Sequence, residues 1–230
     1  MREILYGRQP VREALRAGRR NVFKLLIATG VRSTGIIGQI LSLDKLGGEV
    51  NHQGLAAEVS GYPYCDLADL ISAAQEVRQD PFLLLLDHIQ DPQNLGSLLR
   101  TAEAVGVHGV VLPERRSASV TPAVVRASAG AAEHVQVAQV TNLSRAIEQL
   151  KAKGVWLIGL AALPQAELYT QASLSGPLGL VVGSEGQGLA RLVREACDFL
   201  IRLPMYGQVE SLNAAVAGAI ALYEVRRQRG

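Results

Sequence analysis

The chain has 230 residues, a formal net charge of +2 and 48% hydrophobic residues, enough apolar content to bury a sizeable core in one large or two small domains. No apolar run approaches the roughly 20 residues that a membrane span needs. Met1 leads directly into polar sequence, so we expect neither a membrane protein nor a signal peptide. Cys65 and Cys197 lie far apart without metal-ligand spacing, which favours a reduced, cytoplasmic setting and no metal site.

The basic residues are concentrated at the N-terminus. Residues 1–32 hold eight Lys and Arg against two Glu, a net charge of +6, and the rest of the chain carries −4. Such a basic face suits a polyanionic partner through phosphate contacts and counterion release. The alternative is a solvated face of a small domain, so charge favours a nucleic-acid partner without deciding for it.

The first 74 residues are expected to form a compact α/β module. Helical spacing and strand patterns alternate here, and Asp66 is a candidate N-cap for the last helix. The polar segment 75–81, which ends in a proline, is the predicted linker. The predicted helices of the module cover 9–17, 34–46, 55–59 and 66–74, and the predicted strands cover 22–28 and 49–52.

From Phe82 to the end of the chain, strands alternate with helices. The strands are apolar throughout, which indicates a sheet covered on both faces, and the alternation indicates a largely parallel, doubly wound α/β domain over 82–230. The predicted strands cover 82–87, 109–112, 135–140, 155–160, 179–182 and 199–203, and the predicted helices 95–105, 122–129, 143–153, 189–196 and 214–223.

Three polar loops follow buried strands of this domain. One runs through Asn94 into a helix that carries Arg100, one is the glycine-rich segment 183–188, and one runs from Pro204 to Asn213. Because ligands of open α/β sheets sit at the carboxyl ends of the strands, we expect one shared site. The glycine spacing matches neither the dinucleotide fingerprint nor a P-loop, so an NAD-dependent oxidoreductase and a nucleotide triphosphatase are disfavoured.

Each polar residue of these loops also has a local structural explanation. Ser211 and Asn213 suit the N-cap of the last helix, which reads as apolar on all sides and therefore buried, and Asn94 suits the cap of an earlier helix. Glu185 suits the positive end of a helix dipole, or a partner for an arginine across the site or across a dimer interface. Gly183 alone suits a plain turn, and the arginine at 100 suits a solvated helix face.

Together, however, the loops resemble the three motifs of the SpoU family of RNA ribose 2′-O-methyltransferases (TrmH type, SPOUT class). The match covers about residues 80–226, in the family's motif order and roughly its spacing. The N-terminal part resembles the small RNA-binding domain that often precedes this catalytic domain, notably at His52-Gln53-Gly54, although a structural role for His52 stays open. The motifs are Asn94…Arg100, Gly183-x-Glu185-Gly186-x-Gly188 and Leu203-Pro204-Met205…Ser211-Leu212-Asn213.

The resemblance implies a trefoil knot at the C-terminal end, S-adenosyl-L-methionine (SAM) as cofactor, and a homodimer formed through the knot region with the last helix contributing. The implied cofactor contacts are Gly183, Leu203, Leu212, Met205 and Ala161. The implied catalytic residues are Arg100, Asn94, Glu185, Ser211 and Asn213.

In the family the arginine is the proposed activator of the ribose 2′-OH. Arginine is a poor proton acceptor, so Arg100 either grips the 3′-phosphate or acts as a transient base in a desolvated site. The family often has valine and serine after the asparagine, whereas this chain has Ala214-Ala215. Any hydroxyl contact from that serine is therefore lost here.

The predicted function is SAM-dependent methylation of a ribose 2′-OH in structured RNA, with a guanosine of 23S rRNA as the target. DNA and membranes are not expected partners. One alternative is tRNA as the target. Another is a non-catalytic RNA-binding or ribosome-assembly factor on the same fold, against which the intact motif residues argue.

Overall fold

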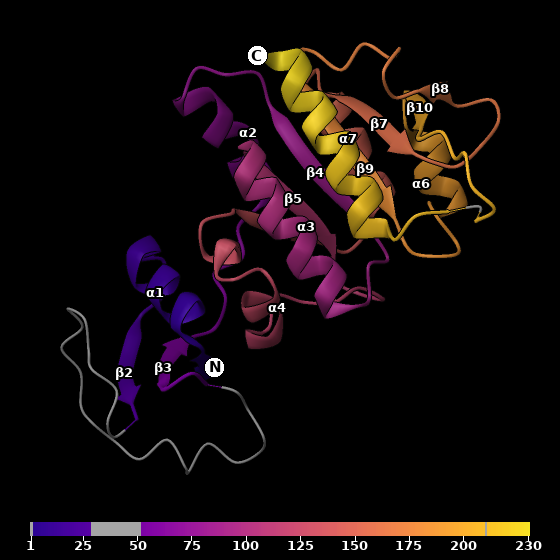
Figure 1. Ribbon diagram of the computed structural model, residues 1–230. Coiled ribbons are helices and arrows are strands. Elements are labelled where there is room, and N and C mark those ends of the chain that lie inside the picture. The colour runs from indigo at the N-terminus through magenta and orange to yellow at the C-terminus, as the bar shows by residue number, and fades with distance from the viewer. Residues whose placement is uncertain (1, 29–51, 210) are drawn as a thin grey trace.

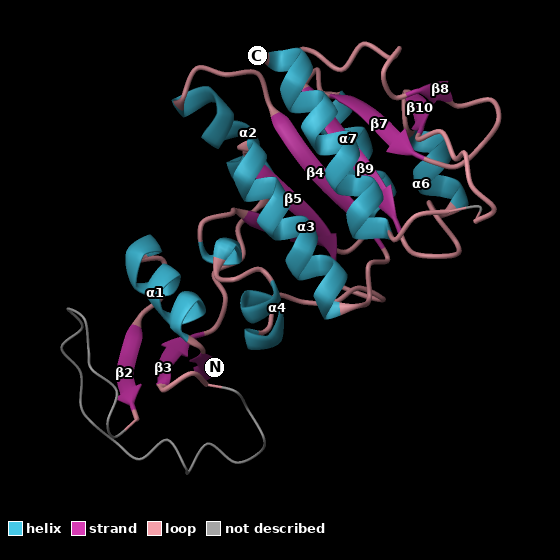
Figure 2. Cartoon of the chain, viewed as in Figure 1, coloured by secondary structure: helices cyan, strands magenta, loops and turns pink. Residues whose placement is uncertain are grey.

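The computed structural model describes residues 2–28, 52–209 and 211–230, which form a small N-terminal sheet module and a large α/β domain (Figure 1, Figure 2). The helix predicted over 34–46 and most of the strand predicted over 49–52 lie outside these residues. Among the described residues, no helix is both long and apolar enough to cross a membrane.

The small module is an antiparallel sheet with α1 (Arg8–Ala17) packed on it. The strand order is β1-β3-β2, with β1 at Arg2–Tyr6, β2 at Val22–Ile27 and β3 at Leu55–Ser60. The helix predicted over 55–59 is therefore wrong. Its Leu-Ala-Ala-Glu sequence favours a helix locally, but this segment is the central strand, and pairing on both edges outweighs local propensity.

The turn containing His52 and Gln53 supports α1. Gly7, the N-cap of α1, has no side chain to cap the helix, and the Gln53 side chain takes over by accepting the backbone N–H of Arg8 at 3.1 Å. The His52 Nδ1 accepts the backbone N–H of Gly54 at 3.0 Å. Both side chains thus have local structural tasks, which agrees with the structural role left open for His52.

Buried charges join the module to the large domain. The Arg20 guanidinium, which is buried, donates to Glu133 at 3.0 Å through Nε and pairs with Glu3 at 2.6 Å through Nη1. Tyr62 OH lies 2.7 Å from the Val135 carbonyl. Because Glu133 belongs to the large domain, these contacts fix the module against it through more than the polypeptide connection.

The large sheet has seven strands in the order β6-β5-β4-β9-β7-β10-β8, and every neighbouring pair is parallel. This confirms the predicted α/β class with a largely parallel sheet. The short β8 was not predicted. The strands are β4 (Phe82–Asp87), β5 (Gly109–Pro113), β6 (Val137–Val140), β7 (Trp156–Leu160), β8 (Glu167–Leu168), β9 (Leu178–Gly183) and β10 (Phe199–Arg202).

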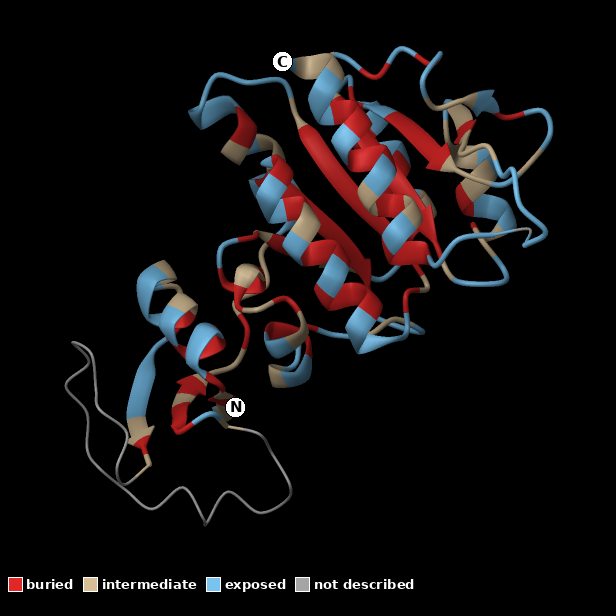
Figure 3. Cartoon of the chain, viewed as in Figure 1, coloured by how far each residue is buried: buried red, intermediate tan, exposed pale blue. Residues whose placement is uncertain are grey.

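Helices cover both faces of this sheet, and alternate strand residues supply two hydrophobic clusters. One cluster joins Leu84 and Val182 to the face under α3, α4 and α7 and continues into the N-terminal module; the other joins Leu83 and Val181 to α2, α5 and α6. Figure 1 shows α3 and α7 side by side, and Figure 3 shows the buried strands behind them. The helices are α2 (Leu67–Glu76), α3 (Pro92–Val105), α4 (Pro122–Ala127), α5 (Leu143–Lys151), α6 (Arg191–Ala196) and α7 (Ala214–Arg229).

Of two predictions about helices, the cap at Asp66 is confirmed and the complete burial of the last helix is wrong. Asp66 caps α2 as predicted, within a capping box completed by Asp69. The prediction that the last helix is buried on all sides is wrong, because Val216, Ile220 and Tyr223 are 49%, 37% and 58% exposed. Their spacing of four and three residues places them on one face of α7.

The register of the central strands brings four strand ends to one edge of the sheet. Asp87 of β4 pairs with Gly183 of β9, Val182 of β9 with Leu160 of β7, and Leu160 with Ile201 of β10. The loops that leave these strands therefore start side by side, which is the arrangement that ligand sites of parallel sheets use.

Candidate functional site

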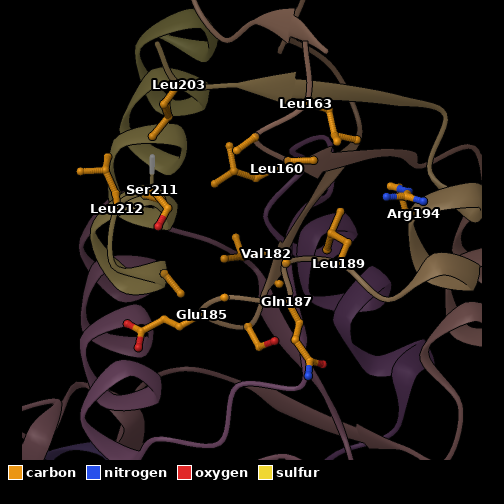
Figure 4. Close-up of a pocket in the computed structure, with 18 of the residues that line it drawn as sticks. Leu160, Leu163, Val182, Glu185, Gln187, Leu189, Arg194, Leu203, Ser211 and Leu212 are labelled. Atoms are coloured by element: carbon orange, nitrogen blue, oxygen red, sulfur yellow. The ribbon is translucent and has the colours of Figure 1, made fainter. Parts of the chain in front are cut away.

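A cavity of about 420 Å³ opens at this edge between the loops that follow β7, β9 and β10 (Figure 4). Apolar side chains converge on it, with Glu185 and Ser211 at its margin. The predicted site residues that line it are Gly183, Leu203, Leu212, Met205, Ala161, Glu185 and Ser211. The structure thus brings all five residues predicted to contact the cofactor into one cavity.

The glycine-rich loop closes on itself beside this cavity. The backbones of Ser184 and Gly188 bond in both directions, at 3.2 and 2.9 Å. A Cβ added to Gly183 would lie 2.5 Å from the Leu189 nitrogen and overlap the Gly188 backbone. Gly183 is therefore required by the packing of the loop itself, and a positive φ of 78° at Gly186 also favours glycine.

Three motif residues, from the first turn of α3 and from the loops after β9 and β10, form one hydrogen-bonded cluster. The Asn94 Nδ2 donates to Glu185 Oε1 at 3.0 Å, and the Asn213 Nδ2 donates to Asn94 Oδ1 at 2.9 Å and also to Glu185 Oε1. Among the described residues, no donor reaches Glu185 Oε2. The cluster fixes the carboxylate at the margin of the cavity and ties the loops after β4, β9 and β10 together.

The explanation of these residues as helix caps is correct for Asn213 and wrong for Asn94. Asn213 is the N-cap of α7, because its Oδ1 accepts the N–H groups of Ala215 and Val216 at 2.9 and 3.1 Å. Asn94 is not a cap, since Asp91 caps α3 and Asn94 lies buried inside its first turn.

Two further local explanations are also wrong. Ser211 stands before the cap of α7 and lines the cavity instead. Glu185 lies in a loop, six residues before α6 begins at Arg191, so a helix dipole does not account for it.

Arg100 lies apart from the cluster. It sits six residues beyond Asn94 on α3, is exposed, and lines neither of the cavities described here. Six residues rotate a helix by one full turn and about a further 240°, so the side chains of Asn94 and Arg100 leave α3 in different directions. The catalytic role of Arg100 stays a prediction.

A second cavity of about 650 Å³ borders the first along the glycine-rich loop, because residues 184–185 and 187–189 contribute to the lining of both. It shares Glu185 with the first cavity and adds Asn94, His88 and Arg116. The sequence interpretation missed His88. The sequence did hold one indication of this residue: His88 directly follows Asp87, the acidic last residue of a buried strand.

The first cavity fits the cofactor that the motifs imply. Its size lies within the usual range of small-molecule sites. Leu160, Val182, Leu203 and Leu212 give it apolar walls that suit a neutral adenosine, while loop backbone and Glu185 offer polar partners. When SAM is bound, it supplies an electrophilic methyl group.

The comparisons with known proteins agree with this geometry. Residues 81–223 match the model of the SpoU rRNA methylase family. YacO of Bacillus subtilis, whose name places it among the TrmH-family tRNA/rRNA methyltransferases, is 44% identical over 241 aligned residues, covering 99% of this chain and 96% of YacO. The chain belongs to the SpoU rRNA methylase family.

Solved structures extend the similarity to the whole fold. The SpoU methyltransferase AviRb of Streptomyces viridochromogenes, in complex with AdoMet (SAM), gives a TM-score of 0.82 at 26% identity, covering 99% of this chain and 90% of AviRb. An RNA 2′-O ribose methyltransferase gives a TM-score of 0.78 at 27% identity, covering 99% and 88%. The family and its SAM-bound structure establish SAM as the cofactor and confirm the predicted fold class.

Proposed function

We propose that the protein transfers the methyl group of SAM to a ribose 2′-OH of structured RNA, and that its target is a guanosine of 23S rRNA. The observation that carries this proposal is the Asn94–Glu185–Asn213 cluster beside the SAM cavity. The similarity to a ribose 2′-O methyltransferase of RNA supports the choice of acceptor. A tRNA target is the alternative, because a neighbour of known structure concerns 2′-OH methylation of C/U34 on tRNA.

In this proposal the two sets of predicted residues have separate tasks. Gly183, Leu203, Leu212, Met205 and Ala161 hold SAM against the apolar walls of the first cavity. The residues that handle the acceptor are Arg100, Asn94, Glu185, Ser211 and Asn213. Positioning of the two reactants by the three loops supplies much of the rate enhancement.

A homodimer through the knot region belongs to the same proposal. Val216, Ile220 and Tyr223 form an exposed apolar stripe along α7, here called the α7 stripe. Burying such a stripe against a second copy is favourable. Arg100 of the partner subunit would then be available to Glu185 Oε2, which explains why Arg100 stands apart in one chain.

The proposal also assigns a task to each part of the chain. Residues 1–74 form an RNA-binding domain, 75–81 a linker and 82–230 the methyltransferase domain. Arg8, Arg12 and Arg16 are exposed along α1 at intervals of four residues and so share one face. This face suits RNA phosphates. The cytoplasm is the expected location, with neither DNA nor membrane as partner.

The test is transfer of radiolabelled methyl from SAM to unmodified 23S rRNA transcripts and to tRNA, with Arg100→Ala beside the wild type. The proposal predicts transfer to rRNA, loss of transfer in Arg100→Ala, and SAM binding by both proteins. Transfer to tRNA alone would select the alternative target. A folded protein that binds RNA but not SAM would support the non-catalytic RNA-binding factor.

A further inference from the structure

Methylation of a hydroxyl group releases a proton, and the protein needs a group to accept it. Arginine is a poor acceptor. Among the described residues that line the two cavities, the side chains able to take a proton are Glu185, Asp91 and His88. The first two are engaged elsewhere. Glu185 holds the amides of the cluster at Oε1, and its Oε2 is the atom assigned above to Arg100 of the partner subunit. Asp91 caps α3 through the Gln93 and Asn94 N–H groups.

His88 is oriented by a buried carboxylate. Its Nδ1 lies 2.5 Å from Asp87 Oδ1, and Asp87, which is fully buried, also accepts the Ala190 N–H at Oδ2 over 2.7 Å. An ionised carboxylate only accepts hydrogen bonds, so the Nδ1 of His88 carries the hydrogen. The Nε2 of the neutral ring is then the acceptor, as in other histidines that a carboxylate holds in one tautomer.

The backbone around the second cavity is held in an uncommon conformation. His88 and Arg116, the histidine and an exposed arginine of this cavity, both have φ of 58°. Non-glycine residues rarely adopt such values, and the strain is often retained where a side chain must be aimed at a ligand. The Ala118 N–H bonds the Ile89 carbonyl at 2.8 Å and ties the two loops together.

We propose that the second cavity receives the acceptor nucleotide and that His88 Nε2 accepts the proton of its ribose 2′-OH. This inference rests on the proposed function. The ribose oxygen attacks the methyl group that SAM carries, so an O–C bond forms as the C–S bond breaks. The proton passes to His88, the sulfonium becomes a neutral thioether, and Asp87 stabilises the resulting imidazolium. Arg116 lies at the same cavity as a cation for the phosphodiester of that nucleotide.

The test replaces the imidazole and then returns it. His88→Gly suits the positive φ at this position, so the substitution removes the side chain without straining the loop. Arg78→Gly is the matched control, since Arg78 also has a positive φ (55°) and is exposed. Arg78 precedes the N-terminal end of β4, whereas His88 follows its C-terminal end. Single-turnover methyl transfer is measured at saturating SAM and RNA, together with the affinity for each.

We expect His88→Gly to transfer methyl at least about 100-fold more slowly than wild type, to keep its affinity for SAM, and to regain activity as free imidazole is added. Arg78→Gly should match the wild type with and without imidazole. A wild-type rate in His88→Gly, or a slow rate that imidazole does not raise, would overturn the inference and leave the proposed function standing. A wild-type protein that methylates neither RNA would overturn both.

Discussion

Asn213 performs two tasks with one side-chain amide. Its oxygen caps α7 by accepting two backbone N–H groups, while its nitrogen donates to Asn94 and Glu185. The residue therefore connects the stability of the C-terminal helix to the geometry of the site. Two substitutions can separate these tasks, because aspartate keeps the capping oxygen and lacks the donor.

Asn213→Asp keeps the oxygen that caps α7 but sets a second carboxylate against Glu185. It should lose roughly 30-fold in methyl transfer, the equivalent of about 2 kcal/mol for donors removed from a charged acceptor. Asn213→Ala should show the same loss of transfer and, in addition, unfold about 1 kcal/mol more easily for want of the cap. Urea unfolding and methyl-transfer assays measure the two effects. Full activity in Asn213→Asp would show that the amide donor is dispensable.

The three motif loops could be recognised from the sequence, and the catalytic roles of their residues stay predictions. The surroundings of His88 and the position of Arg100 could not be predicted. Glycine spacing and strand ends act over a few neighbours, so the loops around Asn94, Glu185 and Asn213 leave a local pattern. The importance of His88 depends on Asp87 being buried and bonded to Ala190, which is over 100 residues away in sequence. A lone histidine in a sequence gives no signal of such a long-range partner.

Among the elements, α7 carries the most information about assembly and stability. One face packs on α3 and β9, and the opposite face exposes the α7 stripe. Residues 214–223 are small or apolar around the whole helix, which predicted complete burial, and the single chain buries only part of this segment. In the dimer proposed above, the second subunit covers this exposed face of the helix.

Ile220→Glu should therefore convert the protein from dimer to monomer, because a carboxylate cannot be buried unpaired at the centre of the stripe. Leu15→Glu on α1 is the control, since Leu15 is 38% exposed and Ile220 is 37% exposed. Sedimentation equilibrium measures the mass of each. Monomeric wild-type protein at micromolar concentration would contradict the proposed dimer.

The last turns of α7 also predict a pH dependence. Hydrogen bonds from Arg227 and then Gln228 lower the pKa of Glu224 to about 2, against about 4.3 for an unperturbed glutamate. Since the pKa is lowered by folding, the stabilisation is complete above the unfolded value and is lost as pH falls towards 2. Glu224→Gln should thus lower the free energy of unfolding at pH 7 and less at pH 3, as urea titrations would show. An equal effect at both pH values would contradict this.

The strand β3 shows why local patterns failed in the small module. Residues 55–59 have good helix propensity, yet this segment pairs with strands that begin about 50 residues earlier and about 30 residues earlier in the chain. The large domain was predicted more completely because its strands are continuous apolar runs and its helices show the helical spacing of apolar residues, so each sequence pattern agrees with the structure formed.

At the scale of the whole molecule, the buried Arg20–Glu133 pair sets the module against the methyltransferase domain. Arg20 Nη2 lies 2.9 Å from Glu133 Oε1, and both side chains are essentially inaccessible to water. Burial raises the pKa of the Glu133 carboxyl, and the Arg20 charge opposes that rise. Removing one partner leaves a buried charge without compensation.

Arg20→Leu should accordingly destabilise the protein by about 3–5 kcal/mol. The double variant Arg20→Leu, Glu133→Leu should recover part of that loss, because the buried Glu133 carboxylate is then no longer left unpaired. Urea unfolding of the wild type, both single variants and the double variant gives the coupling energy. Additive effects would show that the two side chains do not depend on each other.

We propose that the Asn94–Glu185–Asn213 cluster directs SAM-dependent methylation to a ribose hydroxyl. The chemical form of the methylated RNA distinguishes this reaction from methylation of a base. RNA labelled with tritiated methyl by the wild-type protein is hydrolysed in alkali, which needs a free 2′-OH at each cleaved bond. We expect label in alkali-resistant dinucleotides and none from a Glu185→Ala variant. Label in ordinary mononucleotides would place the methyl group on a base and rule out the proposed ribose chemistry.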